Sequence, residues 1–441
     1  MNALWKRRGT SGVVTAMALA GLAVGGFAPD AVAQGAPLEA TTCAFKGTGR
    51  GAPIQLPLVN ASGKPATELD LRTKGFEILI SVAKGKPLRV VLDTGSLGTV
   101  VPESHVGPID SKDIICPGRI TYVSRGIETY YGNWVMAEVG LGMKEKGVAT
   151  ATTNKMPVLV ITAADECSRD DKAQGKGSAD ASVKPVPASP SNPFKVPCDA
   201  APDPKPAANC KRRQNPSIAM MGIGWPGNER FELSLNPMLQ VPVATPGYLI
   251  TGSSVTVGLT EDNTTGFQWL PFRDMPASEP LPQACTTIQS GQNSAVTQCG
   301  SLLVDTGIDY MWVGLQGASC PANTAQGLVP AGQSFSLTAP PPGQGPSALS
   351  YSFQSLPPPP KILNGNTAAA QSARRGYSKM GPSFVRCAGN ASKAFVNTGR
   401  NVIFGADFAF TPACNGGSLP ENCRGGGCRV GFRQPPAPPA K

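Results

Sequence analysis

The sequence V-V-L-D-T-G-S-L-G-T-V-V at Val90–Val101 has a counterpart about two hundred residues later, L-L-V-D-T-G-I-D-Y-M-W-V-G at Leu302–Gly314. In each copy an apolar run ends in Asp-Thr-Gly, and a second apolar run follows. This pattern predicts a strand, a tight turn and a returning strand. The glycine lets the backbone approach the carboxylate that it must hydrogen-bond. Two such turns can bring Asp93 and Asp305 face to face.

A pair of carboxyl groups in contact has a definite chemistry. Both groups cannot ionise together, so they share a proton and their pKa values move apart. One group can polarise a carbonyl while the other, as carboxylate, activates a water. A single Asp-Thr-Gly arises by chance in roughly one chain in twenty of this length. Two copies with matching strands are far less probable by chance, so the pattern favours acid–base hydrolysis.

Length and composition indicate a turn-rich β protein. The chain has 441 residues, enough for two or three domains, and only 15% of them are charged. Glycine (51) and proline (44) are abundant, whereas aromatic residues make up 6%. These values favour strands joined by long loops over a helical bundle.

The N-terminus has the three regions of a secretory signal. Basic residues at Lys6–Arg8 precede an apolar run, Val13–Phe27, and the small residues Ala31–Ala33. We expect a signal peptide over 1–33 and a secreted or periplasmic protein, with Arg7-Arg8 leaving twin-arginine export in a bacterium open. No other stretch reaches eighteen uninterrupted apolar residues, so no stable membrane insertion is expected after cleavage.

The twelve cysteines of an exported chain predict disulfides, and their even number allows six. None of them forms a C-x-x-C pair, and His105 is the single histidine, so no zinc site is expected. The same scarcity disfavours a Ser-His-Asp or Cys-His nucleophile, since His105 is better explained as a surface residue. We therefore expect no metal and no organic cofactor.

The formal net charge is +10, of which Lys6, Arg7 and Arg8 against Asp30 contribute +2, leaving +8 after cleavage. A basic surface favours acidic partners or a cell envelope. No basic stripe is interleaved with aromatic residues, so a nucleic-acid partner is not expected.

The expected organisation is an N-terminal extension followed by two lobes. The extension covers 34–70, the first lobe 71–245 and the second lobe 246–441. Within the first lobe, the Lys-, Asp-, Ser- and Pro-rich stretch 163–216 predicts a long surface insertion stapled by its cysteines.

Two further stretches of the second lobe are expected to lack strands. Residues between Phe272 and Ser301 should form a loop in which Cys285 and Cys299 bridge locally. The Gly-, Pro- and Cys-rich tail from Cys414 should also be loop.

These segments, taken together, resemble the pepsin-like aspartic proteases. The family's first hairpin and active-site loop are similar to F-E-I-L-I-S-V-A-K-G-K-P-L-R-V-V-L-D-T-G-S (Phe76–Ser96), and its flap to R-I-T-Y (Arg119–Tyr122) with the following hairpin. Its apolar-apolar-Gly element is similar to A-M-M-G-I-G-W-P (Ala219–Pro226) in the first lobe and to N-V-I-F-G-A-D-F (Asn401–Phe408) in the second. The landmarks follow the family's order across most of the chain.

The resemblance implies an all-β, bilobal pepsin-like fold, with two β-barrel-like lobes and a central active-site cleft. It implies a divergent, exported aspartic endopeptidase that acts as a monomer on peptide or protein substrates. Asp93 and Asp305 would carry the catalysis.

The resemblance also assigns roles to the residues around the two aspartates. Thr94 and Thr306 would hydrogen-bond across the lobes, and Gly95 and Gly307 would present backbone N–H groups to the carboxylates. Ser96 would donate to the outer oxygen of Asp93. The flap residue over the substrate would be Tyr122.

Three residues or turns depart from the family pattern. Ile308 replaces the usual Ser or Thr, so Asp305 is expected to lose a hydroxyl donor, which would raise its pKa and the pH optimum. Val100 replaces a tryptophan that pairs with the flap tyrosine. The flap turn Val123–Gly126 lacks one of the usual glycines, so the flap is expected to be held differently.

Two other functions fit part of the sequence. One is a binding or inhibitor protein at the cell envelope, built on the same scaffold with weak or lost catalysis. The other is a disulfide-rich envelope or adhesion protein, which accounts for the export signal, the cysteines and the charge but not for the paired loops.

Overall fold

The protein is built almost entirely of β-strands. The computed structural model describes residues 51–122, 127–143, 148–167, 196–198, 210–225, 232–243, 245–275, 278–290, 295–320, 327–356, 381–412 and 427–435, with residues 43, 45, 194 and 423. They belong to one compact unit, Leu38–Lys441. The predicted signal peptide, the flap turn at 123–126 and the middle of the predicted insertion lie outside the described residues.

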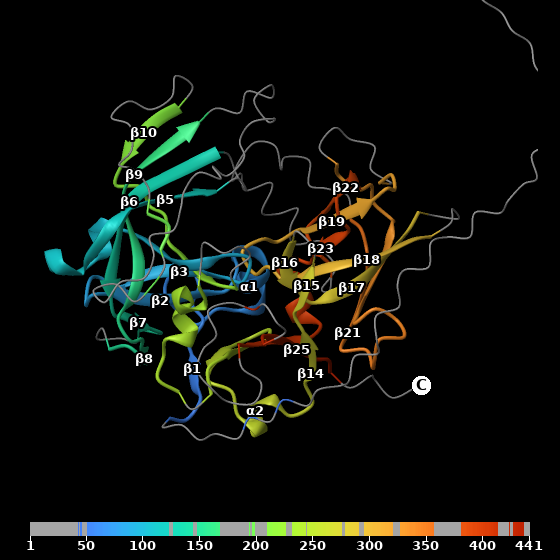
Figure 1. The fold of residues 1–441 in the computed structure, drawn as a ribbon, viewed down its shortest axis with the longest axis horizontal. Coiled ribbons are helices and arrows are strands. Elements are labelled where there is room, and N and C mark those ends of the chain that lie inside the picture. The colour runs from blue at the N-terminus through green and yellow to red at the C-terminus, as the bar shows by residue number, and fades with distance from the viewer. Residues whose placement is uncertain are drawn as a thin grey trace, which may run out of the picture. The chain divides into compact units, whose positions relative to one another are not determined.

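The first half of the chain forms a ten-stranded sheet, at the left of Figure 1. Its path runs β5 (Ile114–Tyr122), β6 (Ile127–Ala137), β9 (Met156–Cys167), β4 (Leu97–Pro102), β11 (Met220–Ile223), β3 (Leu88–Asp93), β2 (Glu77–Val82), β7 (Val139–Leu141) and β8 (Ala151–Thr152), with β10 (Cys210–Gln214) beside β9.

The second half forms a seven-stranded sheet, at the right of Figure 1. The order is β21 (Leu349–Gln354), β20 (Ser334–Ala339), β17 (Gln283–Gln289), β18 (Val296–Leu303), β23 (Phe395–Asn397), β19 (Met311–Gln316) and β22 (Val385–Ala391).

The two sheets repeat one local arrangement. In the first, β11 lies between β3 and β4, parallel to β3 and antiparallel to β4. In the second, β23 lies between β18 and β19, again parallel to the strand before the Asp-Thr-Gly turn and antiparallel to the strand after it. Each Asp-Thr-Gly therefore leaves its sheet at an equivalent point, with one strand inserted between the two that it connects.

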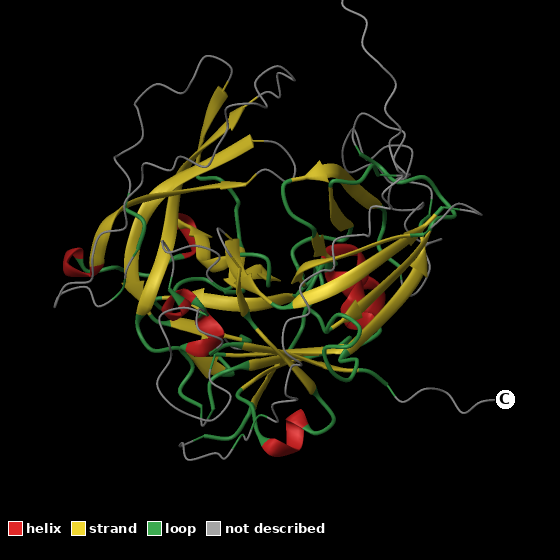
Figure 2. Ribbon diagram, turned by 45° about the vertical axis from the view of Figure 1, so that its right-hand side comes forward, coloured by secondary structure: helices red, strands yellow, loops and turns green. Residues whose placement is uncertain are grey.

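A third sheet of six strands joins distant parts of the chain. Its order is β1 (Ile54–Leu56), β13 (Val255–Val257), β12 (Tyr248–Ile250), β24 (Asp407–Thr411), β25 (Arg429–Arg433) and β14 (Gln268–Pro271). A separate pair comprises β15 (Arg273–Met275) and β16 (Ser278–Leu281). Figure 2 shows how few helices accompany these strands.

The helices of the described residues are short. They are α1 (Glu68–Lys74) and α2 (Glu261–Thr264), with 3-10 turns at Glu103–His105, Ser111–Asp113, Leu233–Leu235, Pro237–Leu239 and Arg400–Phe404. In α1, Thr67 and Asp70 form a reciprocal capping box, and Gly75 ends the helix with φ of 105°. The helix packs against the main core through the buried side chain of Leu71.

The predicted N-terminal extension contributes to the folded body. Strand β1 pairs with β13 of the six-stranded sheet, and α1 also begins within the extension at Glu68. Proline and glycine on both sides of the three-residue strand conceal it from a sequence pattern.

The predicted insertion is ordered at both ends. Strand β9 continues to Cys167, and β10 pairs with it from Cys210 to Gln214. Here the charged residues of both strands face one another, with Arg212 bound to Asp165 at 2.7 and 2.8 Å. Ion pairs therefore replace the apolar pattern on which the strand prediction depended.

Two predictions of loop are wrong. Between Phe272 and Ser301, β17 and β18 form an antiparallel pair, and the disulfide Cys285–Cys299 connects them as expected. In the C-terminal tail, β25 lies inside the six-stranded sheet between β24 and β14. Frequent Gln and Thr in the first region and Gly in the second weaken the apolar alternation by which a strand is recognised in a sequence.

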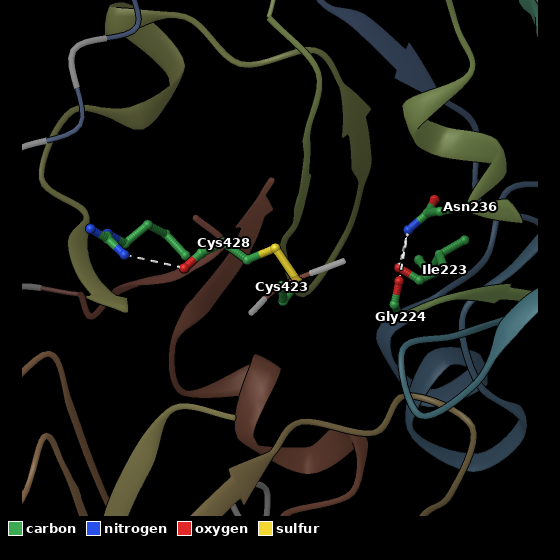
Figure 3. Close-up of a disulfide and its surroundings, with 6 residues drawn as sticks. Ile223, Gly224, Asn236, Cys423 and Cys428 are labelled. Carbon is green, nitrogen blue, oxygen red and sulfur yellow. Dashed lines mark hydrogen bonds between the residues drawn. A yellow bond between two sulfur atoms is a disulfide. The ribbon is translucent and has the colours of Figure 1, made fainter. Parts of the chain in front are cut away.

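Disulfides connect both halves internally. Four are described: Cys116–Cys198, Cys285–Cys299, Cys320–Cys387 and Cys423–Cys428. Cys43 and Cys210 are also disulfide-bonded. The short Cys423–Cys428 link precedes β25 (Figure 3), and both of its cysteines are fully buried in the main core.

Candidate active site

The structure brings Asp93 and Asp305 together at the ends of their equivalent strands. Their residues are only 7% and 9% exposed. Each carboxylate accepts a hydrogen bond from the glycine of its own turn, with Gly95 N to Asp93 Oδ1 at 2.8 Å and Gly307 N to Asp305 Oδ1 at 2.9 Å. These are the backbone contacts that the resemblance implies.

The two turns are interlocked by their threonines. Thr94 N donates to Thr306 Oγ1 and Thr306 N donates to Thr94 Oγ1, both at 3.0 Å. Each hydroxyl donates in turn to the opposite half, to Val304 O and Leu92 O at 2.6 Å. The four contacts are related by an approximate two-fold, which fixes the two carboxylates relative to one another. The chain has the pepsin-like fold.

Close approach of the two turns requires glycine in each of them. A Cβ built on Gly95 would overlap the carboxyl of Asp305, and one on Gly307 would overlap that of Asp93. In the pepsin-like arrangement each glycine therefore serves two purposes, because it donates to its own aspartate and leaves space for the other one.

The two carboxyl groups are hydrogen-bonded to each other, and their environment favours one shared proton. Burial raises the pKa of Asp305 to about 7, and the neighbouring charge of Asp93 acts in the same direction. Hydrogen bonds from Asn397 and Gly307 oppose this shift without reversing it. Asp305 therefore holds its proton at pH values at which an exposed carboxyl has lost it.

The outer oxygen of Asp93 is bound as the sequence suggests. Ser96 Oγ donates to Asp93 Oδ2 at 2.6 Å and lies 3.7 Å from the sulfur of Met220 on β11. Met220 supplies an apolar wall, so the donor in this half comes from the turn itself.

The outer oxygen of Asp305 has a donor that sequence reasoning missed. Asn397, at the end of β23, donates through Nδ2 to Asp305 Oδ2 at 2.8 Å. Its own Oδ1 accepts from Gly399 N at 3.0 Å, which fixes the orientation of the amide. Ile308 supplies no hydroxyl to Asp305, as expected, but the amide of Asn397 takes the place of that donor. The pKa of Asp305 is raised as expected, with burial as the main cause. The signal available in the sequence was a polar residue ending the apolar run A-F-V at Ala394–Val396.

The predicted second-lobe counterpart of the apolar-apolar-Gly element is also wrong. Residues 401–404 continue a 3-10 turn, and the strand β24 that follows belongs to the six-stranded sheet. The inserted strand is β23, and Gly399 lies so close to the turn that a Cβ there would overlap Tyr310 O. Gly405 directly follows apolar residues, whereas Asn397 and Thr398 precede Gly399, so only strand pairing identifies β23 as the inserted strand.

Each turn is supported from behind by a different set of side chains. In the first half, Asn236 Nδ2 donates to Ile223 O and Gly224 O at 2.6 and 3.0 Å (Figure 3), and Tyr248 also donates to Ile223 O. In the second half, Arg400 donates to Ile308 O at 3.1 Å and to Gly307 O at 3.3 Å. A buried guanidinium thus holds the backbone of the second turn.

The backbone of Tyr122 ends β5, opposite Glu128 of β6, so it stands at the tip of the hairpin that the resemblance assigns to the flap. Its side chain and the turn after it lie outside the described residues.

Val100 is buried beside Trp134, whose Nε1 donates to Pro197 O at 3.1 Å. The hairpin pairs further with β9, and β9 with β10. The flap strands are therefore continuous with a wider sheet.

Within the described residues, no three His, Cys, Asp or Glu side chains gather as a metal site. His105 lies in a 3-10 turn, with Nδ1 3.2 Å from Ser104 Oγ. No helix in the described ranges is both long and apolar enough to span a bilayer.

No protein-family model matches the sequence, and no curated protein matches it. Among solved structures, basic 7S globulin from soybean is similar over 86% of this chain and 96% of its own, with 12% identity and a TM-score of 0.39. Conglutin gamma, a basic 7S globulin from lupine seeds, is similar over 87% and 95%, with 10% identity and a TM-score of 0.40. Similarity at this level carries no functional argument.

Proposed function

We propose that this chain is an exported aspartic endopeptidase that hydrolyses peptide bonds with a water activated by Asp93 and Asp305. The observation that supports the proposal is the buried carboxyl pair, held by interlocked turns, in which burial and the charge of Asp93 raise the pKa of Asp305. A pair with this environment has both an acid and a base available at the same pH.

In the proposed mechanism the proton resides mainly on Asp305, whose pKa is raised to about 7 by burial and by Asp93. Asp305 donates to the carbonyl oxygen of the scissile bond, while Asp93 accepts a proton from the attacking water. Ser96 and Asn397 keep the outer oxygens oriented. The proton accepted by Asp93 then passes to the leaving amine as the C–N bond of the tetrahedral intermediate breaks, and a hydroxyl of that intermediate returns a proton to Asp305.

The proposal extends to compartment and partners. The described disulfides suit an oxidising compartment, in agreement with a cleaved signal over 1–33 and a secreted or periplasmic location. We expect a monomeric, divergent member of the pepsin-like proteases that acts on peptides or unfolded proteins, with Tyr122 on a flap over the substrate. Nucleic-acid binding is not part of the proposal.

The test is hydrolysis of a reduced, unfolded protein by the purified chain between pH 3 and 8. Asp93→Ala and Asp305→Ala should each lower the rate by roughly 10³-fold or more, because each removes one partner of the acid–base pair. Circular dichroism and thermal unfolding would establish that both variants are folded. Cleavage that persists in both folded variants would exclude this dyad as the catalyst.

A binding protein on the same scaffold predicts a different result. It would bind a peptide that carries a hydroxyl in place of the scissile carbonyl, yet cleave nothing at any pH. The complete set of donors around both aspartates favours the enzyme, because a binding function alone has no use for a shared proton.

A further inference from the structure

One face of the second sheet presents a row of side chains that leads away from Asp305. Strands β23, β19 and β22 are adjacent, and Asn397, Trp312 and Arg386 are direct partners across them. Directly opposed residues project from the same face of a sheet. Since Asn397 reaches Asp305, Trp312 and Arg386 stand on the face that carries the catalytic pair.

The opposite face of these strands is core. The neighbours of the row along each strand are at most 6% exposed: Met311, Val313, Val385, Cys387 and Val396. Trp312, by contrast, is 44% exposed and is one of the few large hydrophobic residues at the surface of the described chain. An exposed tryptophan between buried neighbours and a catalytic pair indicates a binding surface.

Aromatic rings surround Arg386 on this face. Tyr310 and Phe384 are stacked with centroids 4.8 Å apart, and the Arg386 guanidinium carbon lies 5.3 and 5.7 Å from their centroids. Trp312 meets Phe395 edge to face at 5.2 Å. The rings hold the guanidinium in place through cation–π contacts.

Arg386 has no anionic partner among the described residues. No carboxylate there lies within ion-pair distance, and its Nε is buried without a hydrogen-bond partner. Two other part-buried arginines do have such partners, since Arg212 pairs with Asp165 and Arg433 with Asp407. An oriented guanidinium with unused donors is suited to a carboxylate from outside the chain.

We propose that Trp312 and Arg386 form a subsite for an acidic side chain of the peptide substrate. The inference rests on the proposed function and adds a substrate class to it. Adjacent strands are about 4.8 Å apart, so Arg386 lies roughly 10 Å from Asn397 along the row. An extended peptide advances about 3.3 Å per residue. The favoured Glu or Asp therefore lies about three residues from the cleaved bond, and Trp312 contacts the residues between.

The experiment uses amidated peptides of one sequence that carry Glu, Gln, Ala or Lys at each position on both sides of the cleaved bond. The wild type should cleave one Glu peptide about tenfold faster in kcat/KM than its Gln partner, as expected for a charge-assisted pair. Arg386→Met should reduce this ratio to near one, whereas Arg386→Lys should retain part of it. Lys112→Met removes the same charge from an exposed 3-10 turn and should leave the ratio unchanged.

Two controls address the source of the carboxylate and the fold. A Gln peptide with a free C-terminus should gain nothing over its amidated form, because the proposal concerns a side chain; a gain that depends on Arg386 would assign the subsite to a terminal carboxylate instead and overturn it. Circular dichroism would establish that Arg386→Met is folded, and the Glu/Gln ratio within one variant cancels any general change in its rate. The preference should also weaken as salt is added.

The outcomes separate this inference from the proposed protease activity. Equal cleavage of all Glu and Gln pairs by the wild type would overturn the subsite while the protease remains. If no peptide is cleaved, the protease proposal fails, and calorimetric binding of hydroxyl-containing Glu and Gln peptides decides the subsite. A Glu preference that disappears in Arg386→Met would support it, and equal binding would overturn it.

Discussion

The two active-site turns share a backbone and differ in the side chains around it. Both present Asp-Thr-Gly, both donate a glycine N–H to the inner carboxylate oxygen, and both use the threonine hydroxyl to reach the opposite half. The outer oxygens differ. Asp93 is bound by Ser96 on the turn, and Asp305 by Asn397 on the inserted strand.

The difference shows that both outer carboxylate oxygens can keep a hydrogen bond although the donor residue stands at a different position in the sequence of each half. In the first half, a polar Ser96 faces an apolar Met220, and in the second an apolar Ile308 accompanies a polar Asn397. Register places Met220 and Asn397 at matching points, each two residues before a glycine packed on its turn. In each half, one polar and one apolar residue occupy the position after Asp-Thr-Gly and the matching position on the inserted strand.

The largest effect should appear in the pH dependence of stability. The pKa of Asp305 is 3.8 in a model peptide and about 7 in the folded protein. The contribution of Asp305 to the free energy of unfolding is fully present below about pH 4. It is lost as pH rises to about 7, because in this range the carboxyl of the unfolded chain has released its proton while that of the folded protein has not. Asp305→Asn should remove this loss, which is on the order of a few kcal/mol.

Urea unfolding at several pH values would measure the effect as the difference between the wild type and Asp305→Asn, so that other titrating groups cancel. A difference that stays constant from pH 4 to pH 8 would contradict a raised pKa at this residue.

A change of donor should have the next largest effect. Asn397→Ala should lower kcat on the order of 10²-fold, comparable to loss of one donor to a reacting oxygen in other active sites. Asn397 lowers the pKa of Asp305, so its loss should also move the alkaline limb of the pH–rate profile upward by roughly one unit.

The double variant Asn397→Ala with Ile308→Ser sharpens this comparison. It moves the donor back to the turn, as in the first half, and should restore part of the rate and of the alkaline limb. Ile308→Ser alone serves as the control. If the double variant is no better than Asn397→Ala, the two halves are not interchangeable in this respect.

Replacing either of the interlocked threonines should lower the free energy of unfolding by the same amount, because their contacts are equivalent in the two halves. Thr94→Val and Thr306→Val each leave a buried N–H and a carbonyl of the opposite half without a partner. Each should lower the free energy of unfolding by about 2–3 kcal/mol. Calorimetry at pH 5 would compare them, with Thr99→Val as a control, since the buried Thr99 hydroxyl has no partner. Unequal losses for the two threonines would argue against the two-fold.

The smallest effect concerns the flap side of the first half, where part of the insertion packs against β6. Trp134→Phe removes the hydrogen bond to Pro197 O and should cost about 1 kcal/mol. Trp269→Phe is the matched control, because that indole packs against the rings of Phe45 and Phe267 and its nitrogen has no hydrogen bond among the described residues. Equal losses in both variants would mean that packing, and not this hydrogen bond, anchors the insertion.

Much of the site could be predicted from the sequence because its signals are local. Asp-Thr-Gly between two apolar runs specifies strand, turn and strand within a dozen residues, and the glycine and Ser96 contacts follow within three residues of Asp93. Asn397 could not be found in this way, since 92 residues separate it from Asp305. The pattern of two apolar residues and a glycine selects Gly405, because Asn397 and Thr398 precede Gly399, and only strand pairing places β23 beside the turn.

The sequence by itself determined the two carboxylates, their turns and the all-β character, since backbone preferences and side-chain alternation act between near neighbours. The tertiary structure decided which strand is inserted beside the second turn, which side chain completes Asp305, and how far burial raises the pKa of that residue. It also decided that β1 and β25, from opposite ends of the chain, share one sheet. These outcomes depend on strand register and on the exclusion of water, and both arise only when segments far apart in the chain pack together.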